Sequence, residues 1–373
     1  MSVTSSLLVT RCSFWESWRL MLWFGFGFGG FGQLKSGTAT ALSSPEPVQL
    51  RGLERKTLAK SVPSWSYTAY VTDDGSLLLS GCIAGSPQQS IWFHHLDCRD
   101  VLPSEKYLLV LIKGRAECWD VAHLDCAGTA PEPMWKMELS DVHNAAFPLV
   151  DKGHVLLQPP FFRELPPSLQ AQKMALGNEH VVLLTSDGKV LTWGAGRHGQ
   201  LGHGDVEDVS EPRLVEALHG VTMSEVAAGG WHSVAVSESG DIYCWGWNES
   251  GQLGLPSKTL QLERVSFEEG PTGCDMDEDS EFIGLQAFPA LIDLPQEIEV
   301  AKAGCGSRHT AAVTRSGELF TWGWGKYGQL GHGDTKNLDQ PKRVEFFYQN
   351  KFCVTDVTCG HWSTYVTCGL GAK

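Results

Sequence analysis

Short apolar runs broken by glycine turns set the pattern of the second half of the chain. Val181–Leu184 and Val190–Trp193 flank a Ser-Asp-Gly turn at Gly188, and the same arrangement recurs around Gly240 and Gly317. Runs of β-branched, aliphatic and aromatic residues on either side of such a turn are typical of β-hairpins, where glycine supplies a positive φ. We therefore expect short strands joined in hairpins, and an all-β fold.

These hairpins belong to a long internal repeat. Three stretches superimpose, and their shared residues keep one spacing, 52 positions from the first to the second and 77 from the second to the third. The repeat positions are Gly177, Gly229 and Gly306, Trp193, Trp245 and Trp322, and Gln200, Gln252 and Gln329. A 52-residue unit with 25 extra residues in one copy accounts for every spacing. Units of this size with glycine and aromatic signatures are typical of β-propeller blades.

A fourth copy is divided between the two ends of the chain. Residues 357–373 begin a unit, with Gly360 at the repeat glycine, and stop before any Gly-Gln-Leu segment. Residues 20–34 contain that segment in Phe-Gly-Phe-Gly-Gly-Phe-Gly-Gln-Leu. Pairing the first and last strands in one blade removes two exposed sheet edges, so we expect the ring to close there. Residues 1–19 have no counterpart in the repeat, and we expect a loose extension.

Fainter copies precede the clear ones, in strand–turn–strand segments around Gly75, Gly114 and Gly153. With the three clear hairpins and the divided copy they make seven units, which predicts a seven-bladed β-propeller closed by N-terminal and C-terminal strands in one blade. The expected organisation is one propeller over residues 20–373, with closing strands at 20–34, degenerate blades at 40–170, regular repeats at 171–254 and 300–356, an acidic insertion at 255–299 and the start of the closing blade at 357–373.

Charge and cysteine content narrow the class of protein. The net charge is −14, and residues 263–299 alone hold eleven Asp and Glu against one Arg. No block of Lys and Arg occurs, which argues against sequence-specific nucleic-acid binding. The longest apolar stretch, Leu20–Phe31, is shorter than the roughly 20 residues of a membrane span, so we expect no membrane insertion. The eleven cysteines contain no Cys-x-x-Cys pair, which favours free thiols in a reducing, intracellular compartment.

The repeat resembles that of a known family. The pattern Trp-Gly-x-Gly-x-x-Gly-Gln-Leu-Gly-His-Gly-Asp, as in Trp322–Asp334, is similar to the regulator-of-chromosome-condensation repeat, and in particular to members that consist of a single propeller. The resemblance implies a seven-bladed propeller. It also implies a range of roles, because the founding member is a chromatin-bound exchange factor for the small GTPase Ran and other members are scaffolds or parts of ubiquitin ligases. The fold alone does not choose among these roles.

Three motifs suggest small-molecule or metal sites, and each has a structural explanation. Gly-x-Gly-x-x-Gly occurs at the same place in three copies of the repeat, beginning at Gly27, Gly194 and Gly323, without the following helix that a dinucleotide site requires. Histidines recur at equivalent repeat positions, which favours turn hydrogen bonds over metal ligation; they are His180, His232 and His309, and His203 and His332. No Gly-x-Ser-x-Gly or His-Glu-x-x-His motif is present. We therefore expect no catalytic residues, no cofactor and no metal.

Positions that differ between otherwise equivalent units are the best candidates for contact with a partner. Trp, Tyr and Arg commonly anchor interfaces, although a propeller Trp can equally belong to the core between blades. The candidates are Arg197, Trp231, Arg308, Lys326, Tyr327 and Trp362. A second set lies in the acidic insertion and comprises Asp275, Asp277, Glu278 and Asp279. These carboxylates are either part of a solubilising loop or a contact for a basic partner such as a histone tail.

Two functions follow as hypotheses. The first is a non-catalytic scaffold that binds histones or a histone-modifying enzyme through residues 40–170 or the acidic insertion. Its expected location is the nucleus and the chromosomes, and a further cytoplasmic location is an open alternative. The second is a guanine nucleotide exchange factor for a Ran-type small GTPase, which acts by stabilising the nucleotide-free GTPase and needs no nucleophile. A role as a ubiquitin-pathway adaptor rests on the resemblance alone.

Overall fold

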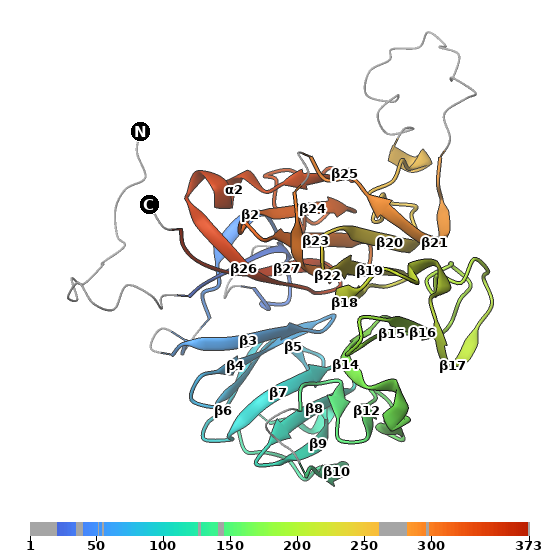
Figure 1. The fold of residues 1–373 in the computed structure, drawn as a ribbon. Helices are drawn as coiled ribbons and strands as arrows, with labels where there is room; N and C mark the ends of the chain where they lie inside the picture. The colour runs from blue at the N-terminus through green and yellow to red at the C-terminus, as the bar shows by residue number, and fades with distance from the viewer. Residues whose placement is uncertain are drawn as a thin grey trace, which may run out of the picture.

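Seven small sheets are arranged around one axis (Figure 1). The computed structural model describes residues 21–34, 40–50, 52–53, 56–125, 128–140, 145–260, 282–295 and 298–371. All pairings between the strands are antiparallel, and the innermost strand of each blade contacts that of a neighbouring blade. The expected seven-bladed β-propeller is therefore confirmed. The expected loose extension, at residues 1–19, lies outside the described residues.

The first three blades come from the part of the chain where the repeat is faint. Blade 1 contains β3 (Leu58–Pro63), β4 (Tyr67–Thr72), β5 (Leu77–Ile83) and β6 (Ser86–Phe93). Blade 2 contains β7 (Cys98–Pro103), β8 (Tyr107–Ile112), β9 (Arg115–Asp120) and β10 (Trp135–Glu138). Blade 3 has three strands in the described residues, β11 (Leu149–Val150), β12 (Gly153–Val155) and β13 (Phe162–Glu164).

The clear repeats form the next three blades. Blade 4 contains β14 (Ala171–Leu176), β15 (His180–Thr185), β16 (Val190–Gly194) and β17 (Val209–Leu214). Blade 5 contains β18 (Met223–Ala228), β19 (His232–Ser237), β20 (Ile242–Trp247) and β21 (Leu285–Ile292). Blade 6 contains β22 (Val300–Cys305), β23 (His309–Thr314), β24 (Leu319–Gly323) and β25 (Leu338–Arg343). The hairpin turn of blade 4 has Gly188 at a φ of 76°, as the sequence predicts.

Helical turns are short and join strands. They include η1 (Val121–His123), η2 (Pro167–Leu169), η3 (Glu216–Leu218) and α2 (Glu345–Gln349), and residues 258–260 are also helical. None of the helices in the described part of the chain has the length and apolarity needed to cross a bilayer.

Blade 7 joins the two ends of the chain. It contains β26 (Phe352–Cys359) and β27 (Ser363–Leu370) from the C-terminal end, with β1 (Leu22–Phe28) and β2 (Ala41–Pro47) from the other end. β1 lies against β27 in continuous register from Leu22↔Cys368 to Gly27↔Ser363, and the blue and red ribbons meet there in Figure 1. The predicted closure is confirmed. The outer strand β2 follows residue 34, so the blade extends beyond the expected closing segment.

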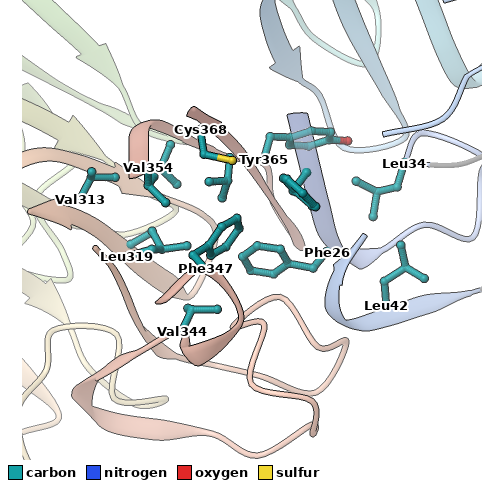
Figure 2. Packing of buried hydrophobic residues seen from close by; sticks show 14 of the residues in the cluster. Phe26, Leu34, Leu42, Val313, Leu319, Val344, Phe347, Val354, Tyr365 and Cys368 are labelled. Carbon is teal, nitrogen blue, oxygen red and sulfur yellow. The ribbon is translucent and has the colours of Figure 1, made fainter. Parts of the chain in front are cut away.

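Apolar side chains fill the space between neighbouring blades. The largest cluster joins blades 6, 7 and 1, where Phe26, Phe347 and Tyr365 are 0–1% exposed. Figure 2 shows Phe26 and Phe347 pointing into the same space from opposite ends of the chain. Burial of such side chains contributes about 1.5–3 kcal/mol each, so ring closure depends on β1.

Ion pairs link the innermost strands around the axis. Lys60 on β3 binds Asp100 on β7, with a distance of 2.5 Å between Nζ and Oδ1. Glu225 on β18 binds Lys173 on β14 and also lies 3.6 Å from Nζ of Lys302 on β22. These residues follow the bulge of their strands at equivalent positions, so unlike charges face one another from blade to blade.

Candidate functional site

The repeat glycines leave room for a histidine ring. A Cβ on Gly229 would collide with the His232 imidazole and lie 2.5 Å from the carbonyl oxygen of Gly306 in the next blade. Gly177 and Gly306 have the same surroundings, made by His180 and His309. At Gly360, where the repeat has no histidine, a Cβ would meet Ser363 and Pro63. These glycines are therefore required by close packing between and within blades.

The histidines bind the following blade. Nε2 of His180 lies 2.9 Å from Oγ of Ser233, which itself donates to the backbone carbonyl of Gln200 over 2.7 Å. Equivalent pairs join His232 to Thr310 and His309 to Thr364 at 3.0 Å. The sequence predicted turn bonds for these rings, and that prediction is wrong, because the hydroxyl partner lies in the adjacent blade.

The other repeat residues also have structural roles. Oε1 of Gln200, Gln252 and Gln329 accepts a hydrogen bond from the backbone amide two positions earlier in each case, which fixes the loop before Gly-Gln-Leu. Trp193, Trp245 and Trp322 are at most 4% exposed. The second histidine of the motif binds a strand hydroxyl, as between His203 and Thr192 at 3.1 Å. The scaffold therefore accounts for the invariant positions.

The varying positions gather on one face of the propeller. This face carries the loops that join the first to the second strand and the third to the fourth strand of each blade. We call it the Trp-rich face and define it by Trp65, Trp231, Trp247, Trp324, Tyr327 and Trp362. All six side chains are exposed or half-buried, in contrast to the buried repeat tryptophans.

One half of the Trp-rich face lies over blades 4 to 6. The rings of Trp231 and Trp247 meet edge to face with centroids 5.4 Å apart. The Arg308 guanidinium lies 4.4 Å from the centroid of Trp247, and its Nη1 is 3.6 Å from a Glu249 carboxylate oxygen. Such stacking holds a cation over an indole while its edge stays available for hydrogen bonds.

A neighbouring ion pair borders this half. Arg197 binds Glu179, and the Trp231 indole donates to the same carboxylate over 3.3 Å. The hydrogen bond from Arg197 holds the pKa of the Glu179 carboxyl below its usual value. The candidates Arg197, Trp231 and Arg308 are therefore brought together at adjacent blades.

The other half lies over blades 6, 7 and 1. Trp324 and Trp362 have centroids 4.7 Å apart, and Trp65 meets Trp362 at 5.4 Å. Tyr327 packs 5.0 Å from Trp324 and 5.1 Å from Phe28 of the closing strand. Tyr327 and Trp362 are thus brought together, and Lys326 is exposed beside them.

Sequence comparison of the repeats missed Trp65, Trp247 and Trp324. Pro63 pairs with Thr68 as Cys359 pairs with Thr364, so Ser64 stands at the repeat glycine and Trp65 at the position of His361. Because serine replaces the repeat glycine and the surrounding blade is degenerate, the position of Trp65 is visible only once the strands are aligned. The ends of β3 and β26 provide that alignment.

A cavity of about 330 Å³ opens where the strand turns of this face converge on the axis. Residues of all seven blades line it, and the repeat glycines Gly177, Gly229, Gly306 and Gly360 are among them. Glu105 is a carboxylate on this lining, and it accepts hydrogen bonds from the hydroxyls of Ser64 and Ser66 at 2.7 and 2.6 Å. The cavity is large enough for a side chain of a partner, and small for a nucleotide.

The acidic insertion starts from the same face. The backbone amide of Asn248, the residue after Trp247, donates a hydrogen bond to the carbonyl of Gly284 over 2.9 Å. The Asn248 side chain donates to the Leu255 and Ile283 carbonyls at 3.0 and 2.8 Å, which holds both ends of the loop together. The candidates Asp275, Asp277, Glu278 and Asp279 lie outside the described residues.

The middle glycine of two Gly-x-Gly-x-x-Gly motifs packs against backbone. A Cβ on Gly196 or Gly325 would lie on the carbonyl of Glu207 or Lys336, so these glycines serve the close approach of two backbone segments. Within the described ranges, no three His, Cys, Asp or Glu side chains come together in a way that could hold a metal ion.

Comparison with known proteins agrees with the repeat pattern. Two family models, both described as the regulator of chromosome condensation (RCC1) repeat, match the chain. One matches residues 187–236, 239–313 and 316–367, and the other matches residues 171–200, 224–252 and 300–329. The human protein named RCC1 domain-containing protein 1 is 45% identical to this chain, over 92% of this chain and 96% of its own length.

Solved structures share the fold. The crystal structure of Kap60 bound to yeast RCC1 (Prp20) has a TM-score of 0.70 at 15% identity, and covers 95% of this chain and 90% of that chain. The structure of Prp20p from Saccharomyces cerevisiae, described together with its binding properties to Gsp1p and histones, has a TM-score of 0.68 at 16% identity and covers 95% and 92%.

Proposed function

The chain belongs to the regulator of chromosome condensation (RCC1) repeat family, and from that premise we propose that it is a non-catalytic scaffold associated with chromatin. It binds histones or a chromatin-modifying enzyme, and so influences chromatin state and chromosome segregation. The proposed location is the nucleus and its chromosomes.

The observation that carries the proposal is that aromatic side chains are exposed at positions where the blade does not need an aromatic residue for its own packing. Glu179, Trp231, Arg308 and Trp362 occupy one position in four successive blades, so the fold accepts an acid, a base or an indole there. Trp65 and Tyr327 leave 44% and 38% of their surface exposed. Exposed indole, phenol and guanidinium groups are typical anchors of protein interfaces.

Charge and family likeness support a chromatin partner. The insertion rooted beside Trp247 carries most of the net negative charge of the chain, and histones are basic. Opposite charge increases the association rate between two proteins. Prp20p, which shares the propeller fold, has binding properties to histones. Residues 40–170, which depart from the consensus, are the proposed source of a partner-specific surface.

The alternative is nucleotide exchange on a Ran-type GTPase. Prp20p also has binding properties to Gsp1p, and exchange requires tight binding of an empty GTPase rather than a nucleophile. A surface of positioned aromatic and charged groups is compatible with either function. The two functions differ in what the partner does after it binds.

Direct binding to histones tests the proposal. The full chain, the variant W231A/W362A and the control Y348A would be titrated with labelled histone octamers at about 0.15 M salt. Tyr348 is 57% exposed and lies on α2, away from the Trp-rich face, so Y348A removes an exposed ring without touching that face. We expect W231A/W362A to bind at least tenfold more weakly, since an anchor residue contributes about 2 kcal/mol or more. Equal binding by all three proteins would contradict a role for this face.

The acidic insertion needs its own variant. Reversing Asp275, Asp277, Glu278 and Asp279 to lysine is expected to lower the association rate with histones and to reduce its salt dependence. An unchanged rate would remove the insertion from the proposal and leave the Trp-rich face in it.

A GDP-release assay separates the alternative. We expect the full chain to leave the rate of GDP release from a Ran-type GTPase unchanged. A marked acceleration that W231A/W362A abolishes would overturn the scaffold proposal in favour of exchange.

A further inference from the structure

The outer strand of blade 5 differs from its counterparts in side-chain chemistry. Each outer strand of blades 4 to 6 contains one proline, and pairing to the third strand fixes their alignment. In blade 5, Leu291 and Ala290 pair with Tyr243 and Cys244 of the third strand. In blade 6, Arg343 and Lys342 pair with Phe320 and Thr321, which stand at the same positions of the third strand. By this register, Phe288 stands where blade 4 has Glu211 and blade 6 has Gln340.

The apolar residues of β21 are exposed. Leu285, Phe288 and Leu291 have 39%, 52% and 54% of their surface accessible. Phe288 packs over Gly204 of blade 4, where a Cβ would collide with the ring, and its other side faces solvent. Blade 6 has Gln340 and Arg343 at the positions of Phe288 and Leu291, and blade 4 has Glu211 and Leu214 there, so the propeller fold does not require apolar residues at both positions. A row of large apolar side chains on an outer strand favours association unless a partner covers it.

Strand addition is a poor way to cover this edge. The carbonyl of Ala287 already accepts a hydrogen bond from the Gly204 amide over 3.0 Å, and that of Phe288 accepts one from the Gln286 side chain over 3.0 Å. Pro289 has no amide hydrogen to donate. A partner must therefore recognise the side chains of Leu285, Phe288 and Leu291 rather than the backbone.

Charge defines the rest of the partner. The sequence that leads into β21, residues 261–281, contains eight Asp and Glu and one Arg. We propose that the patch formed by Leu285, Phe288 and Leu291 is a docking site for a partner segment that presents two or more large apolar residues flanked by Lys or Arg. The apolar residues pack on the patch, and the net charge of −14 on the chain attracts the flanking cations. This proposal is independent of the Trp-rich face.

A peptide array tests the proposal with the full chain. The array holds 15-residue peptides of three kinds: Leu/Phe cores with Lys/Arg flanks, the same cores with Asp/Glu flanks, and Ser cores with Lys/Arg flanks. We expect binding to the first kind only, confirmed by fluorescence anisotropy of the best peptide. The test variant F288Q/L291R installs the residues that blade 6 carries at the same positions, so the strand stays compatible with the fold. We expect its affinity to be at least tenfold weaker.

Controls make the result specific. K342A alters the outer strand of blade 6 and is expected to bind as the parent does, and so is W231A/W362A. Equal affinity of F288Q/L291R and the parent, binding to acid-flanked or Ser-core peptides as strong as to the first kind, or no binding at all would overturn the proposal. So would a dimer of the parent in sedimentation that F288Q/L291R dissociates, because a second copy of the chain would then be the occupant.

Discussion

Three buried imidazole rings lie between blades 4, 5, 6 and 7, and they are uncharged at neutral pH. Each ring packs against a glycine of its own blade and uses Nε2 to reach a hydroxyl of the next blade. Burial lowers the pKa of His180 to about 4, and those of His232 and His309 to about 3, from 6.5 in an exposed ring. Protonation of any one of them would place a charge in a closed apolar space.

This geometry predicts a loss of stability in acid. Below pH 6.5 the unfolded chain binds protons that the folded chain excludes, so the free energy of unfolding falls as pH decreases toward 4. Each histidine contributes up to about 1.4 kcal/mol per pH unit in that window. We expect H309Q to show a smaller slope of unfolding free energy against pH than the parent, measured by urea denaturation between pH 7 and 5.

The matched control is H219Q, which replaces an exposed histidine at the end of η3. Its slope should equal that of the parent. Equal slopes for the parent, H219Q and H309Q would show that the buried ring is not responsible.

Single residues differ in how far the sequence reveals their role. The repeat glycines and Gln200 recur at constant spacing, and their contacts follow from that recurrence. The inter-blade partner of His180 does not follow from the repeat, because Ser233 becomes a neighbour of His180 only when two blades pack together. Trp65 was missed for a related reason, since serine stands at the preceding repeat glycine.

At the scale of the strands, ion pairs as well as apolar residues position five of the innermost strands, which are β3, β7, β14, β18 and β22. Glu225 is 4% exposed and bridges β14 and β22 through Lys173 and Lys302. Removing its charge leaves Lys173 and Lys302 without the carboxylate that pairs with both.

We therefore expect E225Q to lower the free energy of unfolding by about 1–2 kcal/mol, because a hydrogen-bonded charged pair is lost while water still reaches the lysines. E299Q provides the comparison, since Glu299 pairs with Arg315 on the exposed surface and should cost less than about 1 kcal/mol. Both values come from urea denaturation at pH 7. A larger cost for E299Q than for E225Q would contradict the bridging role.

Strands were predictable where a glycine turn joins two apolar runs. The central hairpins of the blades, such as β15–β16 around Gly188, follow this rule. Outer strands such as β17 and β25 are polar and contain proline, so their local sequence has no strand signal. They form because the third strand of the blade offers an unpaired edge.

At the scale of the whole molecule, the ring holds together only if its ends meet. β1 supplies Phe26 to the cluster between blades 6, 7 and 1, and no other described strand covers β27 on that side. The cooperative unit therefore includes both ends of the chain.

We expect F26A to lower the free energy of unfolding by about 3–5 kcal/mol, the usual cost of truncating a fully buried phenylalanine. Unfolding should remain a single transition, followed by tryptophan fluorescence and circular dichroism. F31A, at a half-buried ring in the loop after β1, is the control and should cost clearly less. Equal costs, or a separate early transition for F26A, would show that the closing strand is not part of the cooperative ring.

Affinity purification of the full chain from nuclear extract, with and without EDTA, tests the central claim most directly. Chelation of magnesium empties small GTPases, and an exchange factor binds the empty form most tightly. The account predicts that histones or a chromatin-modifying enzyme are recovered in both samples, are lost with W231A/W362A and are retained with Y348A. A small GTPase enriched only in EDTA, or partners unaffected by W231A/W362A, would contradict it.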